Sequence, residues 1–397
     1  IKMKKSLIII TLLTILASSC FNPVFYNITQ DVPPEKATVS GVINSIIRYE
    51  VNGKQYLVLA ADKGIRYKEA DSTTRTEWRT YNNLPFNLSG FDHTSSKHEG
   101  QSIIKVIADK ENLYILSTTY KIDDDLQLSV PDVVTLYSTQ ITSWDSNTTW
   151  QTVCSGNDYF KFTVEDDYVY SNFNAFCTNS VKTDHREAYL RCNNEYYKLD
   201  GIQPITPLTI QDEQLLAGES KDNHLNSAVY FNGKTYFFNS VAAVTNETKD
   251  TFAEYIYFGK GNTLKYYSKD DGVKTAIENC GAPISCLAPC KDALLIGRGD
   301  FSNDIDYTTG GLTKTTLTNG IPGNQLTKFS TNAHIQLSES YYILTLINTD
   351  PSKSELQSTL YASIAFVGSG SNATAGVNYD NIGLWSYYPS RGNWNRE

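Results

Sequence analysis

The stretch TSWDSNTTW, residues 142–150, combines an expected polar turn with a following tryptophan, and this combination indicates the fold. Asp145 stands on an expected hairpin turn, and Trp150 follows five residues later, where the chain returns to a strand. A carboxylate beside an aromatic residue could be a fragment of an active site. It could also be a turn that recurs because the whole fold recurs. The rest of the chain distinguishes the two, because a recurring turn should have copies.

Copies of a related unit are present along the chain. In each copy a polar turn leads into a short aliphatic or aromatic strand, as a buried hairpin requires. The copies are VNGKQYLVLA (51–60), ADKENLYILS (108–117), VEDDYVYSNF (164–173), IQDEQLLAGE (210–219), PCKDALLIGR (289–298) and LSESYYILTL (337–346). Asn232-Gly233 is a strong signal for a two-residue hairpin turn. Proline-containing links such as Gly320-Ile321-Pro322 precede further strands. Proline suits a loop that leads into a strand better than the middle of a central strand.

These units predict modules of four strands that start near residues 41, 101, 158, 206, 240, 284 and 331. Seven modules average about 51 residues each, which is typical of propeller blades. We therefore predict an all-β chain with a single β-propeller over residues 41–397. Seven blades are favoured and six larger blades are the alternative. The abundance of Tyr (27) and Phe (16), with a single Met, agrees with strands rather than helices.

The hairpins resemble the Asp-box repeats of sialidase-type propellers, whose pattern is Ser/Thr-x-Asp-x-Gly-x-Thr-Trp. Ser143, Asp145 and Trp150 match this pattern, and Asn147 replaces the glycine; Ser268, Asp270 and Gly272 match a second copy that lacks its Trp. The links also resemble the propeller repeats of bacterial two-component regulators. The resemblance implies that the Asp accepts hydrogen bonds from its own turn and that the Trp packs between blades. TSWDSNTTW is therefore interpreted as structural.

The N-terminal segment is expected to be separate from the propeller. Lys2, Lys4 and Lys5 precede an apolar run at residues 7–17 that is too short to span a bilayer. The sequence that ends at Cys20 resembles a bacterial lipoprotein signal with the looser spacing of spirochaete lipoproteins, which implies a lipid on Cys20. We predict a signal peptide at 1–20, a tether at 21–40 and attachment to the bacterial envelope, with the outer membrane favoured. An ordinary secretory signal is the alternative.

The remaining cysteines are even in number, which in an exported chain is compatible with three disulfides. They are Cys154, Cys177, Cys192, Cys280, Cys286 and Cys290. Buried free thiols are the alternative. The spacing of the last three fits no common zinc pattern, so neither a metal nor another cofactor is expected. The net charge is −9, and no run of Lys or Arg occurs beyond the first five residues. Nucleic acid is therefore not expected as a partner.

No convergent catalytic set is evident. The chain has no Gly-x-Ser-x-Gly motif, and its arginines are not arranged as in the sialidase arginine segment. We therefore expect a non-enzymatic scaffold that presents propeller loops to a protein or glycan. A carbohydrate-active enzyme with its site in the central channel, and a periplasmic envelope-assembly lipoprotein, are the alternatives. Arginines or paired carboxylates in the channel would favour an enzyme, whereas Tyr, Ser and Asn would favour a binding protein.

Arg298-Gly299-Asp300 spells an integrin-type adhesion tripeptide.

Overall fold

The structure is a computed structural model, and it describes most of the chain beyond residue 38. The described residues are 39, 41, 43–61, 64–72, 78–88, 100–123, 128–156, 158–165, 168–201, 205–216, 218–299, 310–329, 341–366 and 382–397. All of them except Arg396 belong to one compact unit. The predicted signal peptide, the tether and Cys20 lie outside these residues. No helix in the described ranges is long and apolar enough to cross a membrane.

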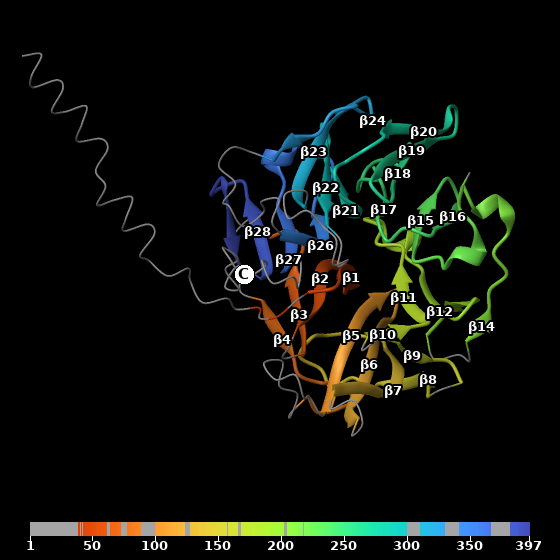
Figure 1. The fold of residues 1–397 in the computed structure, drawn as a ribbon. Helices are drawn as coiled ribbons and strands as arrows, with labels where there is room; N and C mark the ends of the chain where they lie inside the picture. The colour runs from red at the N-terminus through yellow and green to blue at the C-terminus, as the bar shows by residue number, and fades with distance from the viewer. Residues whose placement is uncertain are drawn as a thin grey trace, which may run out of the picture. The chain divides into compact units, whose positions relative to one another are not determined.

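Antiparallel sheets account for nearly all of the regular structure (Figure 1). The first sheet contains β1 (Ile46–Val51), β2 (Lys54–Ala61), β3 (Gly64–Glu69) and β4 (Arg79–Tyr81); the second contains β5 (Gly100–Ala108), β6 (Leu113–Asp123), β7 (Leu128–Thr139) and β8 (Gln151–Ser155). A separate hairpin of β9 (Phe162–Glu165) and β10 (Tyr168–Ser171) precedes the third sheet, which contains β11 (Phe173–Cys177), β12 (Ala188–Cys192), β13 (Glu195–Leu199) and β14 (Thr206–Pro207).

The later sheets follow the same order. The fourth has two strands, β15 (Ser227–Phe231) and β16 (Lys234–Phe238); the fifth contains β17 (Ala243–Thr245), β18 (Tyr255–Lys260), β19 (Thr263–Ser268) and β20 (Gly272–Ile277). The sixth contains β21 (Ile284–Pro289), β22 (Ala293–Arg298), β23 (Gly311–Thr318), β24 (Ile321–Pro322) and β25 (Thr327–Lys328); the seventh contains β26 (Tyr341–Asn348), β27 (Leu360–Phe366), β28 (Gly383–Tyr388) and β29 (Asn393–Arg396). The described helices are the 3-10 turns η1 (Thr183–His185), η2 (Asp212–Gln214), η3 (Lys221–Asn223) and η5 (Glu355–Gln357).

The hairpins arise from local turn chemistry. Asn232 and Gly233 join β15 to β16 with φ of 50° and 81°, and the flanking residues Phe231 and Lys234 pair directly. Two consecutive residues with positive φ define the type I′ turn, whose twist matches that of antiparallel strands. The two-residue turn predicted from Asn232-Gly233 is confirmed.

The first strand of each sheet contacts the first strand of the next. Along the chain these contacts join β1 to β5, β5 to β11, β11 to β15, β15 to β17, β17 to β21 and β21 to β26. β26 in turn contacts β1, so the series closes into a ring. Figure 1 shows these strands around a common centre, with the later strands of each sheet farther out. We call them the inner strands.

The hydrophobic core lies between neighbouring sheets rather than at one central point. One cluster joins the first sheet to the second and includes Tyr49, Val58 and Ile115. Another joins the first sheet to the last, through residues such as Leu59 and Leu384. Each sheet therefore buries apolar side chains against both of its neighbours.

A buried ion pair strengthens the contact between the first and last sheets. Lys68 on β3 lies 3.6 Å from a carboxylate oxygen of Glu397, and both side chains are 1% exposed. The Lys68 ammonium also donates to the hydroxyl of Tyr388 and lies 5.6 Å from the ring of Trp78. The backbone of Val39 donates to the carbonyl of Glu397 (3.2 Å). Polar contacts therefore reinforce the closure of the ring.

Two predicted module boundaries were wrong. The third sheet starts at Phe173 rather than near residue 158, because the β9–β10 hairpin intervenes. The fourth starts at Ser227 rather than near 206, where β14 instead completes the third sheet. The segment 210–219, expected to be a turn and strand, forms the turn η2, whose start is capped reciprocally by Gln211 and Gln214. Local side-chain capping therefore replaced the expected strand.

The disulfides expected from the even cysteine count are absent. All six cysteines after Cys20 are free, five of them buried and Cys177 half-buried. They are distributed over separate apolar clusters: Cys154 and Cys192 in one, Cys280 in a second, and Cys286 and Cys290 in a third. They serve as small apolar side chains, which was the alternative interpretation.

We expect Lys68→Met to lower the free energy of unfolding by about 3–5 kcal/mol, because Glu397 would remain buried without a countercharge. Combining it with Glu397→Gln should recover most of the loss. Lys54→Met, which breaks an exposed pair with Glu69 on the same sheet, should cost no more than about 1 kcal/mol. Urea unfolding of the purified variants measures all three. Equal effects of the Lys68 and Lys54 variants would contradict a closing role for the buried pair.

Candidate functional site

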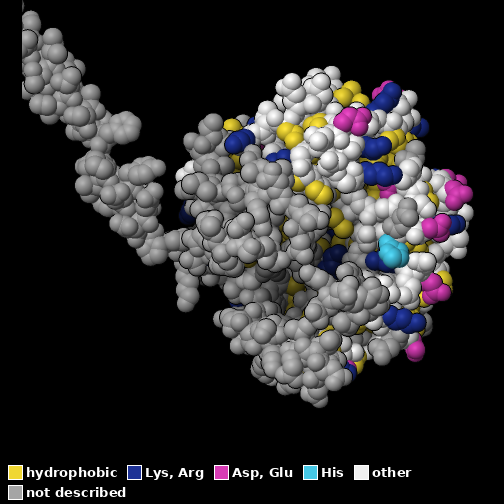
Figure 2. All heavy atoms as spheres, viewed as in Figure 1, with side chains coloured by type: hydrophobic (Ala, Val, Ile, Leu, Met, Phe, Trp, Pro, Cys, Tyr) yellow, Lys and Arg dark blue, Asp and Glu magenta, His cyan; other side chains and the backbone are white. Residues whose placement is uncertain are grey.

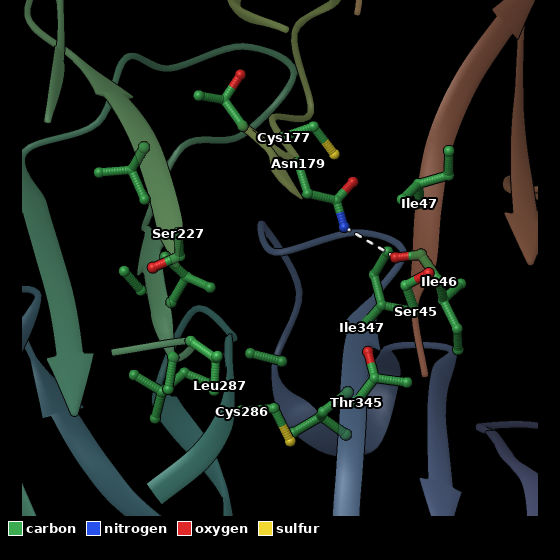
Figure 3. A pocket seen from close by; sticks show the side chains of 18 of the residues that line it. Ser45, Ile46, Ile47, Cys177, Asn179, Ser227, Cys286, Leu287, Thr345 and Ile347 are labelled. Carbon is green, nitrogen blue, oxygen red and sulfur yellow. Dashed lines mark hydrogen bonds between the residues drawn. The ribbon is translucent and has the colours of Figure 1, made fainter. Parts of the chain in front are cut away.

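A cavity of about 350 Å³ lies where the inner strands meet. β1, β5, β11, β15, β17, β21 and β26 all contribute lining residues, although these strands are spread over some 300 positions of sequence. Figure 2 shows a hollow in the middle of this face, with hydrophobic and basic side chains inside it. Figure 3 shows Ser227 and Leu287 on one side of the cavity and Ser45 and Ile347 on the other.

The polar part of the lining consists mainly of amides and hydroxyls. They come from Asn44, Ser45, Thr178, Asn179, Ser180, Asn226, Ser227, Tyr230, Thr245, Ser285, Tyr342, Thr345 and Asn348. Such groups both donate and accept hydrogen bonds without carrying charge. The charged residues in the lining are Arg48, Lys105 and Glu247.

Asn179 uses its side chain to satisfy the inner edge of β1. Its amide nitrogen donates to the carbonyl of Ile46 (3.1 Å), and its amide oxygen accepts from the backbone nitrogen of Arg48 (3.0 Å). The bond to Ile46 is drawn in Figure 3. An inner edge has no next strand to pair with, so a side-chain amide takes the place of one.

Arg48 is a structural cation. Its guanidinium is buried and donates to the carbonyls of Asn179 (3.3 Å) and Asn348. The amide of Asn348 in turn donates to the carbonyl of Pro289 (2.8 Å), which ties β26 to β21. Burial lowers the pKa of Arg48, but a guanidinium remains protonated at neutral pH. Arg48 thus joins three parts of the ring.

Lys105, unlike Arg48, does not bond to backbone carbonyls of the described residues. It is half-buried on β5, and its ammonium donates to the amide oxygen of Asn174 (3.1 Å). None of the ion pairs among the described residues includes Lys105. Burial lowers its pKa to about 8, with a small opposing effect of Cys177. Lys105 is therefore a lining residue whose ammonium has no countercharge among the described residues.

Glu247 lies at the edge of the cavity and is already engaged. Its carboxylate accepts hydrogen bonds from the hydroxyl of Ser180 and from the backbone nitrogen of Lys182 (3.3 Å). It also contacts Nδ1 of His185 (2.5 Å). The imidazole of His185 also stacks on Tyr230, with ring centroids 4.1 Å apart. In a nucleophilic triad the histidine stands between the serine and the acid, whereas here the acid stands between the other two. The arrangement orders two loops and does not activate Ser180.

The described lining of the cavity is partly polar and holds few charged groups. Its described lining holds one arginine and one carboxylate, whereas glycoside hydrolysis uses a pair of carboxylates. Among the described residues no group of three or more His, Cys, Asp or Glu could hold a metal ion.

The first Asp-box-like segment packs against the first sheet. Trp150 donates from its indole nitrogen to the carbonyl of Asn83 (2.5 Å), and Trp144 stacks on Tyr67 with centroids 4.1 Å apart. Asp145 is exposed, and its backbone nitrogen donates to the hydroxyl of Ser143 (3.4 Å). Asn147 is also exposed. None of these residues lines the cavity.

The second copy forms the β19–β20 turn. Ser268 pairs with Gly272, whose φ is +70°, and the Ser268 hydroxyl accepts from the backbone of Asp271 (3.1 Å). Asp270 is exposed beside it. This copy is likewise separate from the cavity.

The adhesion tripeptide is described only in part. Arg298 is 6% exposed, and its guanidinium donates to the carbonyls of Cys280 and Gly310, the latter at 2.7 Å. An integrin-type ligand must present its arginine to a partner, and Arg298 does not do so. Asp300 lies outside the described residues.

Sequence reasoning missed the residues that line the cavity. Lys105 carried a signal, because it interrupts the aliphatic run IIKVIA at residues 103–108. The sequence around Asn179 and Asn348 contains no signal that distinguishes them from the other asparagines of the chain. Their roles depend on which strand edges the fold leaves unpaired.

Comparison with known proteins does not assign the chain to a family. No family model matches it, and no curated protein matches it. Among solved structures, the SapL1 lectin in complex with alpha methyl fucoside is 11% identical over 88% of this chain and 93% of its own, with a TM-score of 0.34. BBS1N in complex with ARL6DN is 10% identical over 85% and 96%, with a TM-score of 0.38. A glycosyl hydrolase from Bacteroides ovatus is 12% identical over 90% and 87%, with a TM-score of 0.29.

Lys105→Met should stabilise the protein by about 3 kcal/mol at pH 7, because one pKa unit corresponds to about 1.4 kcal/mol. The folded pKa of about 8 is below the unfolded value near 10.5. Below pH 8 Lys105 is charged in both the folded and the unfolded chain, so the folded protein carries the full free-energy cost of burying the charge. Between the two values the unfolded chain holds more protons, so the stability of the wild type rises with pH and the advantage of the variant shrinks.

Urea unfolding of wild type and variant at pH 7 and pH 9.5 measures this difference. Lys110→Met is the control, because Lys110 is 57% exposed in the adjacent turn. A gain for the Lys105 variant that does not change with pH would show that burial of its charge is not the cause.

Proposed function

We propose that this chain is a seven-bladed β-propeller that binds a small glycan in its central channel and does not transform it. The closed ring of inner strands supports the propeller and its blade number. The observation that carries the function is the composition of the cavity. Amides and hydroxyls from the inner strands and the segments adjoining them converge there, without a second carboxylate among the described lining residues.

The size of the cavity agrees with a small ligand. About 350 Å³ falls within the 300–1,000 Å³ range of small-molecule sites. Its neutral polar groups suit the hydroxyls of a sugar, each of which both donates and accepts. The lining comes from the inner strands and from the segments that directly adjoin them, so much of the site is formed before the ligand arrives, which limits the ordering cost of binding.

Blocking the channel should abolish sugar binding. Thr345 on β26 is a half-buried lining residue, and Thr345→Trp would place an indole in the cavity. We expect at least a tenfold loss of affinity for any monosaccharide or disaccharide that the wild type binds in a calorimetric panel. Thr327→Trp on the exposed strand β25 is the matched control and should bind like the wild type. Failure of the wild type to bind any sugar, or equal binding by the Thr345 variant, would refute the channel site.

We also propose that the chain is attached to the bacterial envelope by a lipid on Cys20, with the outer membrane favoured. The basic and apolar residues before Cys20 support this proposal. A covalent lipid with a folded binding domain behind it would hold the binding site near a membrane surface.

Radiolabelled palmitate should be incorporated into the full-length protein expressed in a bacterial host. Cys20→Ser should abolish the label and release the protein from the membrane fraction. Cys154→Ser changes a buried thiol of the described region and should keep the label. Palmitate incorporation in the Cys20 variant, or none in the wild type, would refute lipid attachment at this residue.

A further inference from the structure

The ammonium of Lys105 is the feature of the cavity that the binding of a neutral sugar does not use. Arg48, the other cation of the described lining, gives its terminal nitrogens to two backbone carbonyls. Lys105 has three donors, and one of them is engaged, by the amide oxygen of Asn174. Two donors and the positive charge are therefore not engaged by any described residue and remain for a ligand.

The partner of Lys105 is itself held in place. The amide nitrogen of Asn174 donates to the amide oxygen of Asn226 (3.2 Å), and the amide nitrogen of Asn226 donates to the carbonyl of Asn239 (3.0 Å). This relay directs the oxygen of Asn174 toward Lys105 and fixes the position of the ammonium. Asn226 also lines the cavity, so the same bonds hold one of the lining amides in place.

No carboxylate of the described lining is available to neutralise Lys105. Glu247, the acid of that lining, is held by Ser180, the backbone of Lys182 and His185. The described lining thus carries two positive charges against one negative charge. In a partly desolvated site an anion would interact with the free ammonium more strongly than in water.

We propose that the channel ligand is a small polyhydroxylated acid of the hexuronate class, whose carboxylate pairs with Lys105 while its hydroxyls bond to the surrounding amides and hydroxyls. This inference rests on the proposed channel function and specifies its ligand. The hydroxyl partners include Asn179, Ser227 and Thr345, which line the same cavity. The carboxylate accepts the two unused ammonium donors.

Three probes separate the contributions of charge and hydroxyls. Glucuronate carries both, glucose carries the hydroxyls alone, and acetate carries the carboxylate alone. Calorimetry at pH 7 should show that the wild type binds glucuronate at least tenfold more tightly than either of the others. Lys105→Met should reduce the affinity for glucuronate at least tenfold and leave that for glucose within twofold. Lys105→Arg should retain part of the preference for the acid, and Lys110→Met should retain all of it.

The outcomes distinguish this inference from the function on which it rests. Glucose binding equal to glucuronate binding, lost in Thr345→Trp, would overturn the acid while leaving a sugar-binding channel. Acetate binding equal to glucuronate binding would overturn the hydroxylated ligand and leave a simple anion site. An unchanged preference in Lys105→Met would also overturn the inference, and the melting temperature of that variant shows whether it is folded. Absence of binding by all three probes would overturn the hexuronate assignment.

Discussion

Closure of the ring between the last sheet and the first is the constraint on which the other features depend. β26 packs on β1, and the Lys68–Glu397 pair links the outer parts of the same two sheets. Every sheet buries its apolar side chains against its neighbours, so an open ring would expose apolar surface on two sheets at once. A charge pair excluded from water is a costly way to join two sheets unless its geometry is well satisfied. Here Tyr388, Ser386 and the ring of Tyr361 surround it.

The cavity follows directly from this closure. When inner strands meet around a centre, each has an edge without a partner strand, and its backbone groups need other hydrogen-bond partners. Asn179 and Asn348 supply them from side chains, and Arg48 supplies its guanidinium to carbonyls of two neighbouring segments. The polar character of the channel is thus partly a structural requirement. Lys105 differs, because its charge satisfies no backbone group, and this difference is why it points to a ligand.

The sequence predicted local features well and long-range ones poorly. The Asn232-Gly233 turn and the all-β class follow from residue chemistry that acts over a few positions. The starts of the third and fourth sheets could not be placed, because the β9–β10 hairpin and the capped turn at Gln211 use the same polar and apolar patterns as a module start. The cavity brings Arg48, Lys105 and Thr345 together from three sheets, and no spacing along the chain encodes that meeting.

The free cysteines have a consequence for how the chain reaches this fold. Because the six described thiols are unpaired in the folded chain, folding requires no oxidant and no isomerase to correct pairings. In an oxidising compartment the same chain, while unfolded, exposes six thiols that can join in fifteen complete pairings. Rapid closure of the sheets would then protect the thiols by burial, and burial raises the pKa of Cys286 to about 12, which suppresses the reactive thiolate. The order of events, folding before oxidation, would decide the yield of native protein.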